Sequence, residues 1–120
     1  MTLSGAMTVA KMSLVVCEMI ERNYVQAIVS TGALMTHGLV EADGHSHFKY
    51  KPGMSDKELY EKGYDRVYDT LELESNLDDV EAFIRTVLEK YPEDETVCSY
   101  RLSEELGKAL VEAYPNGRGI

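Results

Sequence analysis

The chain has 120 residues, of which 44% are hydrophobic, and its formal net charge is −9. A chain of this length suits one domain. The acidic balance argues against nucleic acid as the main partner, because binding to phosphates requires clustered lysine and arginine. It permits a cationic partner, such as a polyamine or a basic protein loop, with simple solubility as the alternative explanation.

Neither a membrane segment nor a leader is expected. No apolar run approaches the roughly 20 residues that a membrane span needs. Residues 1–13 lack the basic start, apolar stretch and cleavage site of a signal peptide. We therefore expect a cytoplasmic protein with no membrane partner.

The first half of the chain predicts a helix, a strand and a second helix. Apolar residues recur at helical spacing over residues 8–22, and Thr8 is the expected N-cap. Residues 25–30 are nearly all apolar and β-branched, which is typical of a strand buried on both faces. A small polar turn follows, and a second helical pattern then runs through Val40. This order is the first half of a strand–helix–strand unit.

The second half continues the alternation of helices and short strands after a loop over residues 43–53. Helices are predicted over residues 56–62, 75–91 and 102–113, and short strands over residues 66–70 and 96–100. Such alternation predicts an α/β fold with a mostly parallel sheet and helices on its faces. Residues 1–120 are expected to form a single domain that is incomplete at both ends, because residues 3–6 resemble the turn after a strand and residues 116–120 the start of another element.

Two similar turns are candidates for a ligand site. Ser30-Thr31-Gly32-Ala33 stands at the carboxyl end of the best strand, where open α/β sheets bind ligands. A glycine lets the backbone approach a ligand, and a helix N-terminus favours anions such as pyrophosphate. Leu3-Ser4-Gly5-Ala6 repeats the design one unit earlier. An ordinary tight turn is the alternative, because neither G-x-G-x-x-G nor G-x-x-x-x-G-K is present.

Three histidines form the second candidate. His37, His45 and His47 lie within eleven residues, near Glu41 and Asp43, and both residue types are good zinc ligands. A flexible His45-x-His47 loop does not define a tetrahedral geometry and no cysteine is nearby, so we predict no metal site. His37 lies on the helix that opens from the second turn and could bind a ligand or act as an acid or base. An ordinary helix histidine is the alternative.

The remaining polar residues are expected to be structural. Arg66 is predicted to pair with Asp69, and the acidic residues of 72–81 to form a solvated helix face. Cys17 and Cys98 have apolar neighbours and are expected to be small buried side chains rather than a disulfide or metal ligands.

The segments 3–7, 24–37 and 56–70 together resemble the deoxyhypusine synthase family and its prokaryotic relatives, and the resemblance covers nearly all 120 residues. It implies a Rossmann-like three-layer domain, a homotetramer and NAD bound near subunit interfaces. In that family NAD takes a hydride from spermidine, and the butylamine group passes to an enzyme lysine and then to a lysine of a translation factor. Relatives use a second small amine instead and make homospermidine or similar products.

The resemblance also implies site residues. An NAD site would be lined by Ser4, Gly5, Thr8, Ser30, Thr31, Gly32 and Ala33. His37 would face the polyamine, whereas the catalytic lysine belongs to a C-terminal portion of the family that lies outside this chain. Leu34 and Gly38 stand where many prokaryotic members have Asn and Asp. Two alternatives therefore stay open: a non-catalytic subunit that assembles with a full-length relative, and an unrelated small α/β domain with a structural role.

Overall fold

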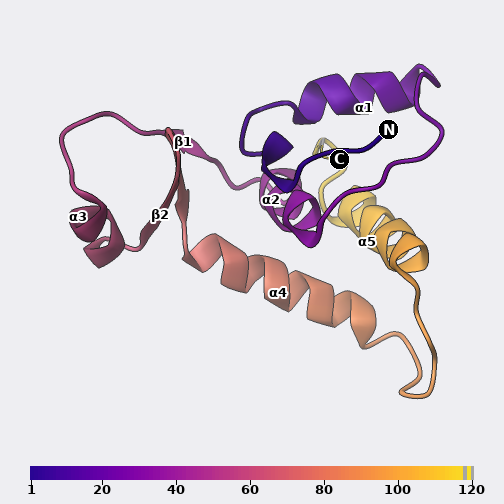
Figure 1. Cartoon of the computed structure of the whole chain (residues 1–120). Coiled ribbons are helices and arrows are strands. Elements are labelled where there is room, and N and C mark those ends of the chain that lie inside the picture. The colour runs from indigo at the N-terminus through magenta and orange to yellow at the C-terminus, as the bar shows by residue number, and fades with distance from the viewer. Residues whose placement is uncertain (118, 120) are drawn as a thin grey trace.

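The computed structural model describes residues 1–117 and residue 119, and helices make up most of its regular structure (Figure 1). A 3-10 turn, η1 (Gly5–Met7), precedes the first helix. The α-helices are α1 (Ser13–Glu21), α2 (Gly32–Ala42), α3 (Asp56–Glu61), α4 (Ser75–Leu88) and α5 (Ser99–Ala113). The strands are β1 (Phe48–Lys49), β2 (Tyr64–Val67) and β3 (Thr70–Leu73). The prediction of an α/β chain is confirmed.

The sheet, however, is antiparallel, so the prediction of a mostly parallel sheet is wrong. Its strand order is β1-β3-β2, and β3 pairs antiparallel with both neighbours. Only two residues connect β2 to β3, and Tyr68 takes a left-handed backbone with φ of 57° there. A connection this short can join only antiparallel neighbours, because parallel strands need a crossover of about a dozen residues. The predicted strand over residues 66–70 is therefore interrupted by a turn.

One parallel contact remains, between the first residues and the end of the segment predicted as a buried strand. Thr2 and Val29 form an isolated parallel bridge. Leu3 N–H donates to Val29 O and Val29 N–H donates to Met1 O, each at 3.0 Å. Residues 25–28 form no strand, and Val29 is 67% exposed. The prediction of a buried strand here is wrong for this chain, since its other edge has no described partner strand.

The helix predictions are mostly confirmed. Helices α2, α4 and α5 fall where helical spacing predicts them, although α5 also absorbs the end of the segment predicted as a strand over residues 96–100. Ser55 and Glu58 form a reciprocal capping box at the start of α3, and Gly63 follows it with φ of 74°. The first helix begins only at Ser13, because Lys11 has φ of 62° and interrupts the helical backbone.

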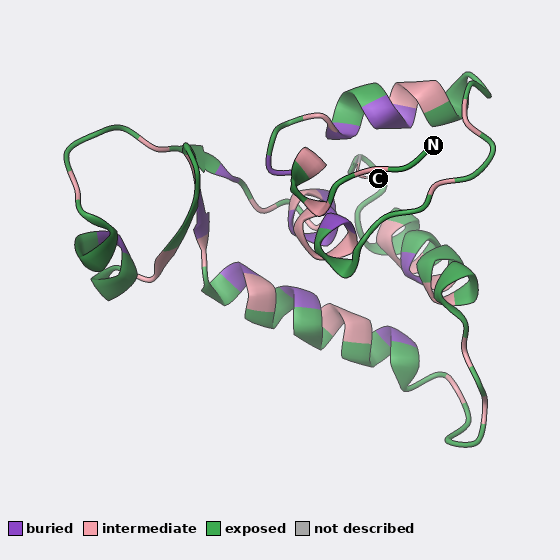
Figure 2. Ribbon diagram, in the orientation of Figure 1, coloured by how far each residue is buried: buried purple, intermediate pink, exposed green. Residues whose placement is uncertain are grey.

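The hydrophobic core lies among three helices. Leu39 and Val40 of α2 pack with Val80 and Val87 of α4 and with Leu106 of α5. The sheet and α3 extend away from this group, as Figure 1 shows, and exposed residues cover much of α1 and α3 in Figure 2. The radius of gyration is 15.5 Å. A typical domain of this length would have about 14 Å, so the arrangement is open.

Among the described residues, none of the helices has both the length and the apolar character required to cross a membrane.

Candidate functional site

The Thr2–Val29 bridge brings the two predicted ligand turns together. Ser30 Oγ donates a hydrogen bond to Leu3 O at 2.9 Å, which ties the second turn to the first. The contact is close: a Cβ at Gly5 would lie 2.5 Å from Thr31 Oγ1 and 2.6 Å from Ala33 Cβ. Only a glycine lets these two turns approach so closely without displacement.

The second turn opens directly into α2. Thr31 is the N-cap, but its side chain makes no capping hydrogen bond. Among the described residues, no acceptor lies in hydrogen-bond contact with the N–H groups of Gly32 and Ala33. A Cβ at Gly32 would meet nothing within 4 Å. The start of α2 thus has N–H groups without an acceptor, on two exposed residues, an arrangement that favours an anion.

The residues predicted to line a cofactor site fall into two groups. Those exposed around the paired turns are Ser4, Ser30, Thr31, Gly32 and Ala33, and Gly5 is partly buried between them. Thr8 is different, because it is fully buried and its hydroxyl lies 3.3 Å from Leu34 O, to which it donates. Thr8 therefore holds α2 in place from behind the turns.

His37 lies further along α2 and belongs to a cluster of histidine and glutamate. Its position, five residues after Gly32, puts it about 8 Å along the helix axis from the free N–H groups. His37 Nδ1 is 2.8 Å from Glu72 Oε2 of β3, and His47 Nε2 is 3.4 Å from Glu72 Oε1. Neither contact has the alignment of a hydrogen bond, and His37 Nδ1, His47 Nε2 and Glu72 Oε1 are buried without a hydrogen-bond partner.

A second carboxylate lies behind His47. His47 Nδ1 is 3.2 Å from Glu41 Oε1. Lys11 Nζ donates to Glu41 at 2.6 Å and Ser13 Oγ donates to it at 2.7 Å. The connected groups therefore run from Lys11 through Glu41 and His47 to Glu72.

Both carboxyl groups of the cluster titrate below their usual range. Burial acts to raise the pKa of Glu41, but Lys11 and Ser13 outweigh it and lower the pKa. Burial likewise acts to raise the pKa of Glu72, but the imidazoles of His47 and His37 outweigh it and lower the pKa. Both side chains are thus carboxylates near neutral pH, and can only accept hydrogen bonds or bind cations.

The prediction for residues 72–81 is wrong at Glu72, which lies on β3 with only 2% of its surface exposed. No local pattern indicated this burial, because Leu71 and Glu72 are consecutive buried residues of β3 rather than alternate ones. His45, which the sequence placed beside His47, lies apart from the cluster and faces Asp79 at 3.2 Å.

Two other predictions are also wrong, one about an ion pair and one about burial. Arg66 pairs with Asp56 through two contacts, Nε–Oδ1 at 2.5 Å and Nη2–Oδ2 at 2.8 Å, rather than with Asp69. Cys98 is exposed, so the prediction that it is buried is wrong, whereas Cys17 is buried as expected.

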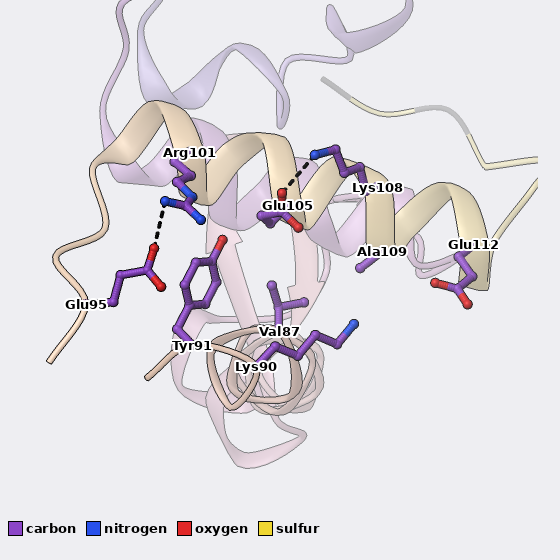
Figure 3. Close-up of a pocket in the computed structure, with 9 residues that line it drawn as sticks. All are labelled: Val87, Lys90, Tyr91, Glu95, Arg101, Glu105, Lys108, Ala109 and Glu112. Atoms are coloured by element: carbon purple, nitrogen blue, oxygen red, sulfur yellow. Dashed lines mark hydrogen bonds and ion pairs between the residues drawn. The ribbon is translucent and has the colours of Figure 1, made fainter. Parts of the chain in front are cut away.

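A pocket of about 340 Å³ between the end of α4 and α5 lies away from all of these residues (Figure 3). Some of its charged side chains are already paired: Arg101 with Glu95 at 2.7 Å, and Lys108 with Glu105 at 2.8 Å. The Arg101 guanidinium also lies 5.5 Å from the centre of the Tyr91 ring. Lys90 and Glu112 also line this pocket, which none of the predicted site residues reaches, and we assign it no role.

Comparison with known proteins identifies one family. The family model described as deoxyhypusine synthase matches residues 1–117. "Probable deoxyhypusine synthase 1" of Methanosarcina mazei is 34% identical over 108 residues, which cover 90% of this chain and 34% of the relative. "Probable deoxyhypusine synthase 2" of the same organism is 36% identical over 112 residues, 92% of this chain and 32% of the relative. A "deoxyhypusine synthase-like protein" of Chlorobaculum parvum is 42% identical over 71 residues, 58% of this chain and 20% of the relative. The chain thus spans about a third of the length of the curated relatives it matches over most of its own length.

Proposed function

Because the chain belongs to the deoxyhypusine synthase family, we propose that it is the cofactor-binding part of an NAD-dependent transferase of aminobutyl groups. The observation that carries the proposal is that two turns meet at the start of α2. One turn contains Ser4-Gly5 and the other contains Thr31-Gly32. The substrate would be a polyamine such as spermidine, and the acceptor a protein lysine or a small amine.

The residues at the paired turns suit a dinucleotide. The free N–H groups of Gly32 and Ala33 would donate to a pyrophosphate oxygen, and the helix dipole of α2 adds a partial positive charge there. The exposed hydroxyls of Ser4 and Thr31 would donate to ribose or phosphate oxygens. The open space at Gly32 leaves room for the ligand to approach the backbone.

Other residues would position the site. When bound, NAD supplies the hydride acceptor for oxidation of the amine. Gly5 would keep the first turn against the second, and Thr8 would hold α2 through its bond to Leu34 O. His37, about 8 Å along the helix from the phosphate end, would face the polyamine and hold or accept a proton there.

The proposal also concerns the wider fold and assembly. The parallel Thr2–Val29 pair would be the ends of two strands of a Rossmann-like sheet. Val29 of this pair is 67% exposed, Tyr24 is 68% exposed, and Leu14 on α1 is 58% exposed. Further family segments, or other subunits of a homotetramer, would cover these apolar side chains.

Titration of the purified protein with NAD in a calorimeter tests the proposal. We expect saturable binding that Gly32→Leu weakens at least about tenfold, because the new side chain would fill the space at the start of α2. Gly107→Leu is the matched control, since a Cβ at Gly107 of α5 also meets nothing within 4 Å. Folded protein that binds no NAD, or equal weakening by both variants, would overturn the assignment.

A non-catalytic partner subunit is the second candidate. Leu34 and Gly38, which replace the Asn and Asp of many members, are both buried on α2, so these positions offer no carboxylate to a cationic substrate. Formation of NADH on adding spermidine to this chain joined to the family's lysine-bearing C-terminal portion separates the candidates. Absorbance of NADH supports the transferase, whereas NAD binding without NADH formation, restored by a catalytically complete relative, supports the partner subunit.

A further inference from the structure

Three elements that are distant in sequence meet at one buried point. His37 comes from α2, His47 from the loop before β1, and Glu72 from β3. The nearest ligand atoms of these three residues all lie within 4.8 Å of one another. The two imidazole rings are 6.0 Å apart at their centres and tilted by 59°, so they face the carboxylate from different directions.

The point is buried but carries no fixed positive charge. The side chains of His47 and Glu72 are 0% and 2% exposed. Within residues 1–117 and 119, no lysine or arginine forms an ion pair with Glu72. A buried carboxylate is costly unless a cation or good hydrogen bonds offset the loss of water. Three atoms of the cluster lack hydrogen-bond partners: His37 Nδ1, His47 Nε2 and Glu72 Oε1.

The tautomer of His47 follows from Glu41. Glu41 is held as a carboxylate by Lys11 and Ser13, so it can only accept, and the proton on His47 must sit on Nδ1. His47 Nε2 then faces Glu72 Oε1 at 3.4 Å with no hydrogen bond between them. A proton or a bound cation on Nε2 would offset the charge of the carboxylate. A histidine that binds a metal through one ring nitrogen usually donates the N–H of the other ring nitrogen to a carboxylate, as His47 Nδ1 would to Glu41.

We propose that His37 Nδ1, His47 Nε2 and Glu72 form a three-ligand site for a divalent transition-metal ion such as Zn²⁺. Two imidazoles and one carboxylate are donors that bind zinc and related ions and leave a further position for water. Zinc bonds of about 2.0–2.1 Å put tetrahedral ligand atoms about 3.4 Å apart. The His37 and His47 contacts with Glu72 are 2.8 and 3.4 Å, and all three ligand atoms lie within 4.8 Å of one another, so the side chains must move to bind an ion.

The ion would link the helical core to the three-stranded sheet. His37 lies on α2, which contributes Leu39 and Val40 to the core, whereas Glu72 lies on the sheet that extends away from it (Figure 1). Glu41, His45 and His47 also line a pocket of about 340 Å³, which lies on the Glu41 side of the cluster and does not include His37 or Glu72. The site stands apart from the proposed cofactor turns, so it can be tested without NAD.

The test is a titration of the chelator-treated protein with ZnCl2, with metal content measured after dialysis. We expect about one zinc per chain, release of protons on binding, and a higher Tm with zinc than with EDTA. Glu72→Gln and His47→Ala should lose this binding. Glu41→Gln should keep the stoichiometry but weaken the affinity about 10–100-fold.

His45→Ala is the matched control, because His45 lies on the same loop but faces Asp43 and Asp79. It should bind zinc as the original protein does. Far-UV circular dichroism of each variant identifies any that fail to fold, and the wild-type stoichiometry and Tm shift do not depend on the variants. No stoichiometric binding by the folded original protein, or binding lost in His45→Ala and kept in Glu72→Gln, would refute the site.

Discussion

Substitution of Gly5 by alanine tests whether the two turns pack as closely as the structure shows. The new Cβ would lie 2.6 Å from Ala33 Cβ and 2.5 Å from Thr31 Oγ1. Carbon atoms normally pack about 3.5–4.0 Å apart, so the turns must separate by about 1 Å. The Thr31 hydroxyl can rotate away, but the Ala33 methyl group moves only with the first turn of α2.

The expected cost follows from that forced movement. Overpacking of this kind destabilises by about 1–3 kcal/mol, and the loss of glycine flexibility in the unfolded chain returns about 0.4–1 kcal/mol. Gly5→Ala should therefore lower the free energy of unfolding by about 1–2 kcal/mol. With a urea m-value of about 1–3 kcal/mol per M, the midpoint should fall by about 1 M.

Gly107→Ala is the internal comparison for this measurement. Gly107 lies within α5, where an added Cβ meets nothing within 4 Å. Alanine there should raise the stability by about 0.5–1 kcal/mol, because glycine weakens a helix interior. Urea unfolding followed by circular dichroism measures both variants. If Gly5→Ala were as stable as the original protein, the close approach of the two turns would be wrong.

Two further predictions concern the core and the buried carboxylates. Leu106→Ala should destabilise the chain by about 2–5 kcal/mol, because Leu106 of α5 is 2% exposed and packs in the core with residues of α2 and α4. A loss below about 1 kcal/mol in urea unfolding would contradict its place in the core. Folding lowers the pKa values of Glu41 and Glu72 below their usual 4.5. The two carboxylates therefore stabilise the fold above pH 4.5, and this stabilisation is lost as the pH falls through their folded pKa values. Tm in EDTA should therefore drop between about pH 5.5 and pH 3.5, and Glu72→Gln should reduce this drop, whereas an unchanged drop would show that Glu72 is not held as a carboxylate.

The helices were the part of the fold most open to prediction from the sequence. A helix satisfies its backbone hydrogen bonds within one segment, so the spacing of its apolar residues and its end signals are local. The apolar stripe of α4 and the glycine that follows α3 were both in the pattern. The late start of α1 was not, because it depends on the left-handed backbone of Lys11.

The strands were predicted less well because a strand is completed by a partner elsewhere in the chain. Residues 25–30 have the composition of a central strand, yet only Val29 pairs, through its bridge to Thr2. Residues 66–70 resemble one strand, but the turn at Tyr68 divides them between β2 and β3. Composition reports the preference of a segment for extended structure, not which edge it finds.

For the candidate sites too, local sequence indicated some features and only the packing of distant segments decided the others. The amino-acid sequence by itself determined the helices, the glycine-containing turns before α2 and, through local motifs, the resemblance to a family. Only the tertiary structure decided that Gly5 packs against Ala33 and that Glu72 is buried between His37 and His47. The physical reason is sequence distance: side chains more than thirty residues apart, such as His37 and Glu72, meet only through the packing of separate elements, which no local pattern records.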